Sequence, residues 1–319
     1  TLRLGVDYRR AQGELQEEPI SAFTGQITAR RRAGGATSDL GLFIEDDWQV
    51  GQLILTGGLR ADRTSVADGF FTEVDASGTV VVDSTFADRS DWTITYRAGA
   101  LLRVTPALDL RAAAYSGLRL PTLNELYRPF VVFPVVTQAN ADLANEELRG
   151  FEAGLDWRVA SGVSLSLTAF DNRLEDAIAN VTLGPNLRQR QNLPAIETQG
   201  IEAGLRLARG PIRFDANLSF SDPRIVGEGA SLPLDGNAPP QSPRWMVAAS
   251  LAYAPSDRTR FALSLRHVGD QFEDDRETDV LPAFTTLGAY AQAPLAGQLN
   301  LVLRAENLFD VDIVTRNNG

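Results

Sequence analysis

The chain has 319 residues, of which 41 are acidic and 30 are basic, so its formal net charge at pH 7 is −11. This balance argues against a nucleic-acid partner, which would need a basic face, and the absence of cysteine excludes a disulfide-stabilised domain and a cysteine-ligated metal protein. Hydrophobic residues make up 44% of the chain, yet no run approaches the roughly 18 apolar residues of a membrane helix.

The strongest pattern in the sequence is an alternation of apolar and polar residues with a period of two. Across 151–159 the odd-numbered residues are all apolar, whereas Glu152, Asp156 and Arg158 lie between them. The even-numbered residues of 92–104 and of 212–220 are apolar in the same way. Such a period indicates β-strands with one apolar and one polar face.

In chain order we expect thirteen strands and one turn of helix near 123–128. Several strands exceed the five or six residues of an average globular strand, and they reach the roughly 9–11 residues that a tilted strand needs to cross a bilayer. The predicted strands lie at 1–10, 38–49, 52–66, 91–105, 107–118, 148–160, 162–176, 194–208, 211–222, 243–254, 258–270, 281–293 and 297–309.

The predicted connections alternate between short and long. The short ones lie at 49–52, 105–107, 160–162, 208–211, 254–257 and 294–297. The long ones lie at 11–37, 67–90, 119–147, 177–193, 223–242 and 271–280. An up-and-down membrane barrel has this order, because its tight turns gather at the periplasmic rim and its long loops at the outer rim.

Four tryptophans lie near the ends of predicted strands. Trp48 and Trp157 lie near the short-turn rim, and Trp92 and Trp245 lie near the long-loop rim, as in the aromatic girdles of outer-membrane barrels. Alternation alone also fits a soluble sandwich. Strand length and the girdles favour an all-β, antiparallel up-and-down transmembrane β-barrel in the bacterial outer membrane.

Four motifs in the right order resemble those of TonB-dependent outer-membrane receptors. The first is the segment LRLPTLNELY at 118–127, and the second is the spacing of Asn140, Leu143 and Glu146 before the strand GFEAGL at 150–155. The third is Asn192 followed by GIE at 200–202, and the fourth is NLFD at 307–310. The residues that match the family motifs are Arg119, Pro121, Asn124, Glu125, Asn140, Leu143, Glu146, Gly200, Glu202, Asn307 and Asp310. Ala141 and Asn145 stand where the family pattern has prolines, and Ile313 stands where it usually has tyrosine.

The resemblance implies a 22-stranded barrel that surrounds an N-terminal plug, with TonB acting on the plug to drive import. Residues 1–37 do not resemble a plug, and the closing strand is not recognised after residue 309. We therefore expect residues 1–319 to be a partial receptor barrel domain, the C-terminal part, with no plug domain in this chain. A complete 14-stranded barrel is the alternative.

The candidate ligand-binding residues are Tyr127, Arg128, Phe130 and Phe133, all in one long loop. Aromatic rings and a guanidinium suit anionic, aromatic iron chelates, although packing of loop against loop explains the same residues. We expect Arg119 and Glu125 to pair and hold the base of this loop. Asn307 and Asp310 are expected to cap a turn at least as readily as to bind a ligand.

Two charge clusters in the predicted outer loops receive structural interpretations. The arginines at 30–32 are expected to be a solvated run, with lipopolysaccharide phosphates as the alternative partner. The acidic stretch 273–277 matches no defined calcium loop, so no metal site is predicted.

No catalytic residue or cofactor is predicted, because the sequence has no nucleophile elbow, phosphate loop or histidine-rich motif. The leading hypothesis is TonB-dependent uptake of a scarce ligand: a ferric siderophore first, with cobalamin, haem and oligosaccharide behind it. The implied partners are TonB, this ligand, and outer-membrane lipid and lipopolysaccharide. The alternatives are a passive 14-stranded porin-like channel and a soluble all-β binding protein.

Overall fold

The computed structural model describes residues 1–21 and 23–317. Within them, thirteen strands follow one another in a single path of hydrogen-bonded neighbours, in the order β1-β2-β3-β5-β6-β9-β10-β11-β12-β13-β14-β17-β18. Each strand pairs antiparallel with the next barrel strand along the chain, which is up-and-down topology. The all-β prediction and the count of thirteen strands are confirmed.

The elements of the path have the following bounds. They are β1 (Arg3–Glu17), β2 (Ala29–Val50), β3 (Leu53–Asp75), β5 (Arg89–Thr105), β6 (Leu108–Arg119), β9 (Glu146–Ala160), β10 (Val163–Gly184), β11 (Leu187–Arg209), β12 (Ile212–Val226), β13 (Trp245–Ser256), β14 (Thr259–Val268), β17 (Phe284–Ala296) and β18 (Leu299–Ala305).

Shorter elements lie in the connections at one end of the sheet. They are β4 (Val80–Phe86), the helix α1 (Leu123–Tyr127), β7 (Phe130–Val132), β8 (Val135–Gln138), the 3₁₀ helix η1 (Gly229–Leu234), β15 (Gln271–Phe272) and β16 (Val280–Leu281). α1 falls at the predicted turn of helix. No helix in the described part of the chain is long and apolar enough to cross a membrane.

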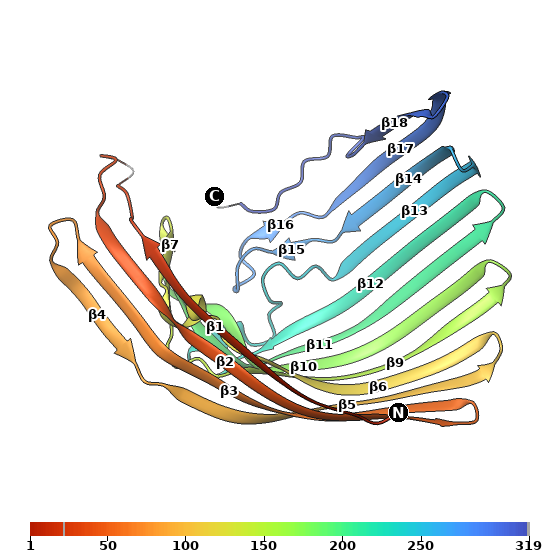
Figure 1. The fold of residues 1–319 in the computed structure, drawn as a ribbon. Coiled ribbons are helices and arrows are strands. Elements are labelled where there is room, and N and C mark those ends of the chain that lie inside the picture. The colour runs from red at the N-terminus through yellow and green to blue at the C-terminus, as the bar shows by residue number, and fades with distance from the viewer. Residues whose placement is uncertain (22, 318–319) are drawn as a thin grey trace.

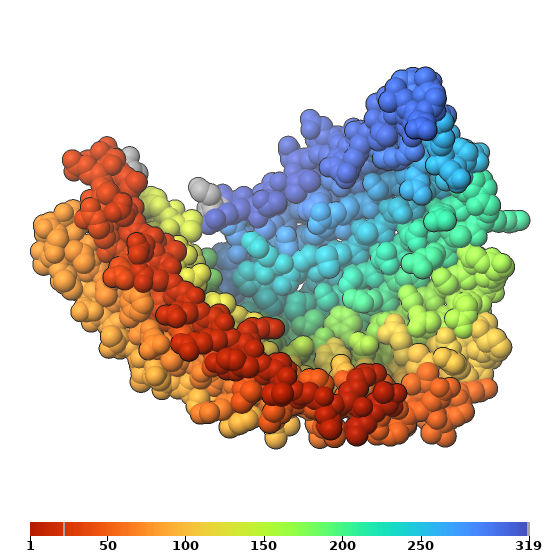
Figure 2. All heavy atoms as spheres, viewed as in Figure 1, coloured from red at the N-terminus to blue at the C-terminus, as the bar shows by residue number. Residues whose placement is uncertain are grey.

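The sheet curves strongly and forms an open trough (Figure 1), whose hollow is seen in the space-filling view (Figure 2). β1 and β18 lie at its two ends and are not paired with each other within the described residues. Residues 120–145, which connect β6 to β9, fold against the inner face of the trough: Leu126 and Tyr127 pack with Val66 of β3, and Asn145 Nδ2 donates to the Thr64 hydroxyl. We call this segment the strap.

The strand register separates two faces of the sheet. On one face Ser166 of β10 lies opposite both Asp156 and Gly204, and on the other Leu165 lies opposite both Trp157 and Leu205. The polar face also carries Thr64, so it is the inner face of the trough. The apolar face is exposed; Ile94, for example, is 72% exposed. A face of this composition is stabilised by lipid, as in a membrane barrel.

The short connections are confirmed. Consecutive strands at that rim are separated by two residues, as between Val50 of β2 and Leu53 of β3. The four girdle tryptophans are exposed on the apolar face, and the Phe220 ring packs on Trp245 at 4.6 Å between centroids.

The prediction of a long loop is wrong for three of the six segments, which are mostly strand. Most of 11–37 and 67–90 is strand, because β1 with β2 and β3 with β4 continue as hairpins, and β10 with β11 extends to a turn between Gly184 and Leu187. Backbone pairing satisfies the amide groups whatever the side chains are, so a polar composition there does not prevent strand formation. The last strand is shorter than predicted, because β18 ends at Ala305 rather than at residue 309.

Candidate functional site

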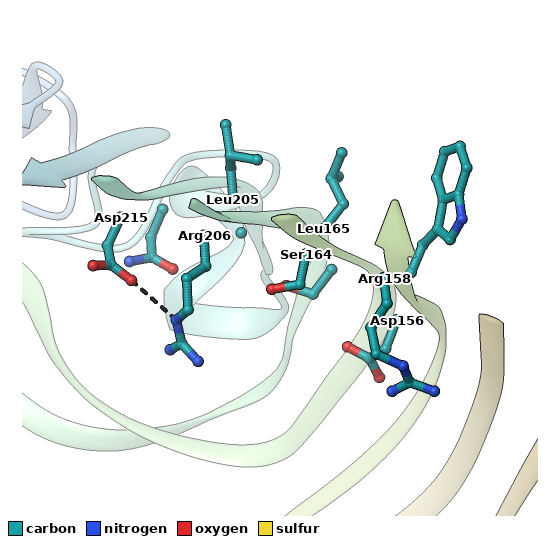
Figure 3. Close-up of a pocket in the computed structure, with 11 residues that line it drawn as sticks. Asp156, Arg158, Ser164, Leu165, Leu205, Arg206 and Asp215 are labelled. Carbon is teal, nitrogen blue, oxygen red and sulfur yellow. Dashed lines mark hydrogen bonds and ion pairs between the residues drawn. The ribbon is translucent and has the colours of Figure 1, made fainter. Parts of the chain in front are cut away.

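Charged and polar side chains cover the inner face close to the short-turn rim. In Figure 3, Asp156, Arg158, Ser164, Arg206 and Asp215 project to one side of the sheet, whereas Leu165 and Leu205 project to the other. The Arg206 Nε donates a hydrogen bond of 3.0 Å to Asp215 Oδ1 on the neighbouring strand. The inner face is therefore a polar wall in which neighbouring strands are joined by their side chains.

The same wall continues from β6 through β9 to β10. The Arg111 Nε donates to Asp156 at 3.2 Å, and its guanidinium also reaches the Thr168 hydroxyl. Farther along the sheet, Arg60 of β3 forms ion pairs with Asp7 and Asp62, each at 2.6 Å. Charge on this wall is thus largely paired within it, across two or three strands at a time.

The base of the strap is held by a three-residue ion-pair network. Arg119, at the end of β6, pairs with Glu125 at 3.1 Å and also with Glu146 at the start of β9. Glu125 completes a capping box with Thr122 at the N-terminus of α1. Burial would raise the pKa of Glu125, but hydrogen bonds from Arg119 and Thr122 outweigh it, so this pKa is lowered. The predicted Arg119–Glu125 pair is confirmed.

The middle of the strap is fixed by an arginine from the β10–β11 hairpin. The Arg190 guanidinium donates to the carbonyl oxygens of Asn124 and Arg128, the latter at 2.9 Å, and lies 5.0 Å from the centre of the Phe130 ring. Arg128 itself forms an ion pair with Glu17 of β1. The strap is therefore tied to both β1 and β11.

The end of the strap is held by backbone contacts. The Arg89 guanidinium donates to the carbonyl oxygens of Ala141, at 3.1 Å, and of Leu143. The Ala144 N–H donates to the Asn192 side chain at 2.9 Å, and the Leu143 side chain is fully buried. The sequence did not point to Arg89 or Arg190, because an arginine that binds distant carbonyl groups leaves no pattern in the residues next to it.

The four predicted ligand-binding residues occupy different environments. Tyr127 is 3% exposed, stacks on Phe86 at 4.8 Å and has its pKa raised by burial, and Arg128 is paired with Glu17. Phe130 is half-buried under Arg190, whereas Phe133 is 91% exposed. In this arrangement only Phe130 and Phe133 face open space, and their role in binding stays a prediction.

A cavity of about 980 Å³ lies between the strap and the loops that connect β12 to β13 and β14 to β17. We call it the outer cavity, because it lies at the long-loop end of the sheet. Phe130 and Phe133 line one wall, Ile178 and Arg188 of the β10–β11 hairpin line another, and Asp274 lies on the loop side. The predicted aromatic loop and the predicted acidic stretch thus share one cavity.

The acidic stretch 273–277 joins the outer loops together. Asp275 accepts hydrogen bonds from the Thr182 N–H at 2.8 Å and the Thr182 hydroxyl at 2.7 Å, and Glu277 accepts from the Ala238 N–H at 2.7 Å. Within residues 1–21 and 23–317, no group of three histidine or carboxylate side chains is placed to hold a metal ion. The carboxylates of Asp275 and Glu277 therefore hold the β14–β17 connection against the β10–β11 hairpin and the β12–β13 connection.

The remaining motif residues have structural contacts. Pro121 is fully buried, Asn140 accepts from the Asp142 N–H at 3.0 Å, and Glu202 lies on the inner face opposite Thr168. Asn307 and Asp310 both adopt positive φ, and the Asn307 side chain bonds the N–H and carbonyl of Val311. The expected turn capping by Asn307 is confirmed.

Gly200 lies where β10, β11 and β12 approach each other closely. A Cβ at this position would meet the Phe170 ring at 2.3 Å and the Phe220 carbonyl oxygen at 2.4 Å. Gly200→Ala should therefore destabilise the barrel by about 1–3 kcal/mol, measured by denaturant unfolding in lipid vesicles. Gly117→Ala is the control, because the nearest atom to its Cβ would be 3.9 Å away. Equal losses in the two variants would contradict this account of Gly200.

The chain also matches known sequences. The family model for the β-barrel of TonB-dependent receptor-like proteins matches residues 1–308. The chain belongs to the TonB-dependent receptor family. This family consists of outer-membrane receptors and transporters, so the place of this receptor barrel is the bacterial outer membrane.

Individual relatives of this TonB-dependent receptor are distant. The iron-regulated outer membrane virulence protein of Vibrio cholerae is 26% identical over 290 residues, 85% of this chain and 40% of the relative. The vitamin B12 transporter BtuB of Photobacterium profundum is 24% identical over 293 residues, 83% of this chain and 45% of the relative. The chain therefore spans less than half the length of these curated relatives.

The fold of the TonB-dependent receptor barrel is also found among solved structures. The ferric yersiniabactin uptake receptor FyuA from Yersinia pestis aligns with a TM-score of 0.77 over 97% of this chain and 46% of that one. The sequence identity is 15%, so this likeness shows the fold alone.

Proposed function

We propose that this chain is part of the barrel of a TonB-dependent importer that takes up a ferric siderophore. The observation that carries the proposal is the outer cavity: a space of about 980 Å³ with aromatic and charged walls at the long-loop end of a membrane barrel. Ligand pockets of this size are typically apolar with a few polar groups that fix orientation. A passive channel has no need of such a cavity.

The names of the relatives support iron as the cargo. One relative is named as an iron-regulated virulence protein and one solved neighbour as a ferric yersiniabactin uptake receptor. The relative named as a vitamin B12 transporter keeps cobalamin as the second candidate. Haem and oligosaccharide remain further candidates of the family.

The polar inner wall supports the coupling to TonB. By resemblance to the family, a plug domain would fill the trough and dock on this wall, and TonB would act on the plug. The 1–319 segment would then be the C-terminal part of a 22-stranded barrel. On this proposal the wall binds and supports, and no residue of the chain has a catalytic role.

Residues on the outward face support the proposal that the barrel contacts lipid and lipopolysaccharide. Arg149 and Arg173, on the strands β9 and β10, lie on the same parity as the lipid-facing Phe151 but nearer the long-loop end. Guanidinium groups at this level would meet the phosphates of the outer leaflet.

Growth rescue tests the proposed function. Cells that lack other iron receptors and express the full-length receptor should grow under iron limitation when a ferric siderophore is supplied, and a deletion of tonB should abolish this growth. A parallel arm with cobalamin as the limiting nutrient distinguishes the second candidate. Uptake that persists without TonB would instead support the passive channel.

A further inference from the structure

The charge of the outer cavity is unlike that of a site for anions. Four carboxylates line it, those of Glu273, Asp274, Asp275 and Asp279, against two guanidiniums, those of Arg188 and Arg316. The lining is therefore net negative, although the aromatic residues of the strap suggested an anionic chelate from sequence. Arg128, the arginine behind that expectation, is paired with Glu17 and does not line the cavity.

Two of these carboxylates accept hydrogen bonds from neutral donors. Asp274 accepts hydrogen bonds from the N–H groups of Arg276 and Thr278 and from the Thr278 hydroxyl, at 2.7 to 3.2 Å. Burial would raise the pKa of Asp274, but these hydrogen bonds outweigh it, so the pKa lies below its usual value. Within the described residues, the Asp275 carboxylate accepts hydrogen bonds only from the Thr182 hydroxyl and N–H, at 2.7 and 2.8 Å. Neutral donors stabilise a carboxylate without cancelling its field.

The two arginines of the lining differ in availability. Arg316 forms an ion pair with Glu273 at 3.5 Å, which offsets the charge of that carboxylate. Arg188 has no ion pair or hydrogen bond of its side chain within the described residues, so its donors are free for a ligand oxygen. One free guanidinium suits a carbonyl or hydroxamate oxygen, but it does not balance Asp274 and Asp275 together.

Part of the cavity wall is apolar. Phe130 and Phe133 contribute to it from the strap, and Ile178, Leu193 and Ile225 contribute to it from β10, β11 and β12. A compact ligand with an apolar periphery fits such a wall, because burial of its apolar surface stabilises the complex.

We propose that the outer cavity selects an uncharged or cationic iron(III) chelate with an apolar periphery, of the tris-hydroxamate kind, and disfavours trianionic tris-catecholate chelates. This proposal rests on the proposed function, since it names the charge class of the imported ligand. Asp274 and Asp275 attract a cationic chelate and tolerate an uncharged one. Arg188 donates to one of the chelate's oxygens, and Phe130 with Phe133 covers its apolar side.

Binding to the purified full-length receptor in detergent tests the proposal, with a cationic iron(III) tris-hydroxamate and a trianionic iron(III) tris-catecholate as probes. The cationic complex should bind more tightly. Asp274→Asn should weaken it by about three- to tenfold and tighten the trianionic complex by a similar factor, whereas Arg188→Gln should weaken the trianionic complex further. Asp270→Asn is the matched control, because it removes one charge from the same connection but does not line the cavity.

Tighter binding of the trianionic complex to the unaltered receptor would overturn the proposal, as would binding of neither complex. Equal effects of Asp274→Asn and Asp270→Asn would also overturn it, because the net charge rather than the cavity would then be responsible. The TonB-dependent growth assay reports separately on import. Growth that requires TonB but is supported only by the trianionic chelate would leave the proposed function standing and remove this inference.

Discussion

Arginine in place of Leu251 should lower the free energy of unfolding of the receptor in lipid vesicles by about 2–4 kcal/mol, the known cost of an arginine on the lipid face near the bilayer midplane. Leu251 lies on the apolar face of β13, opposite Phe214 of β12 and Leu263 of β14, and is 46% exposed. Trp245 and Tyr253 lie on the same face on either side of it along β13. Denaturant unfolding of the full-length receptor, followed by tryptophan fluorescence, measures this loss.

Ser250→Arg is the matched control for Leu251→Arg. Ser250 is the adjacent residue on the same strand, but it lies on the inner face opposite Asp215 and Ser264. An arginine there enters a polar environment next to a carboxylate, so we expect a change of less than about 1 kcal/mol. Similar losses in both variants would contradict the assignment of the two faces.

The membrane-spanning part of the fold was predictable because lipid and lumen impose a strict pattern on the side chains. Leu165 and Leu205 face lipid and are therefore apolar, whereas Ser166 faces the lumen and is therefore polar. The two-residue turns followed from the breaks in this pattern. Beyond the bilayer this constraint ends, and the hairpin of β10 with β11 continues through backbone pairing and a buried cluster that includes Val181 and Leu193.

The candidate site was predictable only in part. Arg119 and Glu125 are six residues apart and belong to a motif, so their pairing was accessible from sequence. Tyr127 and Arg128 have the chemistry of ligand contacts, but the fold places them against Phe86 and Glu17. The partner of the strap, Arg190, lies 62 residues from Arg128 in the chain, and no short-range pattern reports such a contact.

Glu146→Ala should release the strap from the barrel wall. The Glu146 carboxylate is buried, pairs with Arg119 and accepts the Ile178 N–H at 2.6 Å. Its removal leaves the partly buried Ile178 N–H without this acceptor and takes one of the two carboxylates from Arg119, a loss of about 2–3 kcal/mol in the local free energy of opening. Backbone hydrogen exchange in residues 120–145 and at Ile178 should accelerate by a factor of roughly a hundred.

Glu147→Ala separates this local effect from a simple loss of charge. Glu147 is the next residue of β9, lies on the outward face, and pairs with Arg149 at only 3.6 Å. A partly exposed ion pair contributes less than about 1 kcal/mol, so exchange in the strap should stay close to that of the unaltered receptor. Protection of the strap that survives Glu146→Ala would mean that Arg89, Arg190 and Asn192 hold it without the network at its base. In that case the ion pairs of Arg119 would orient α1 without anchoring the loop that walls the outer cavity.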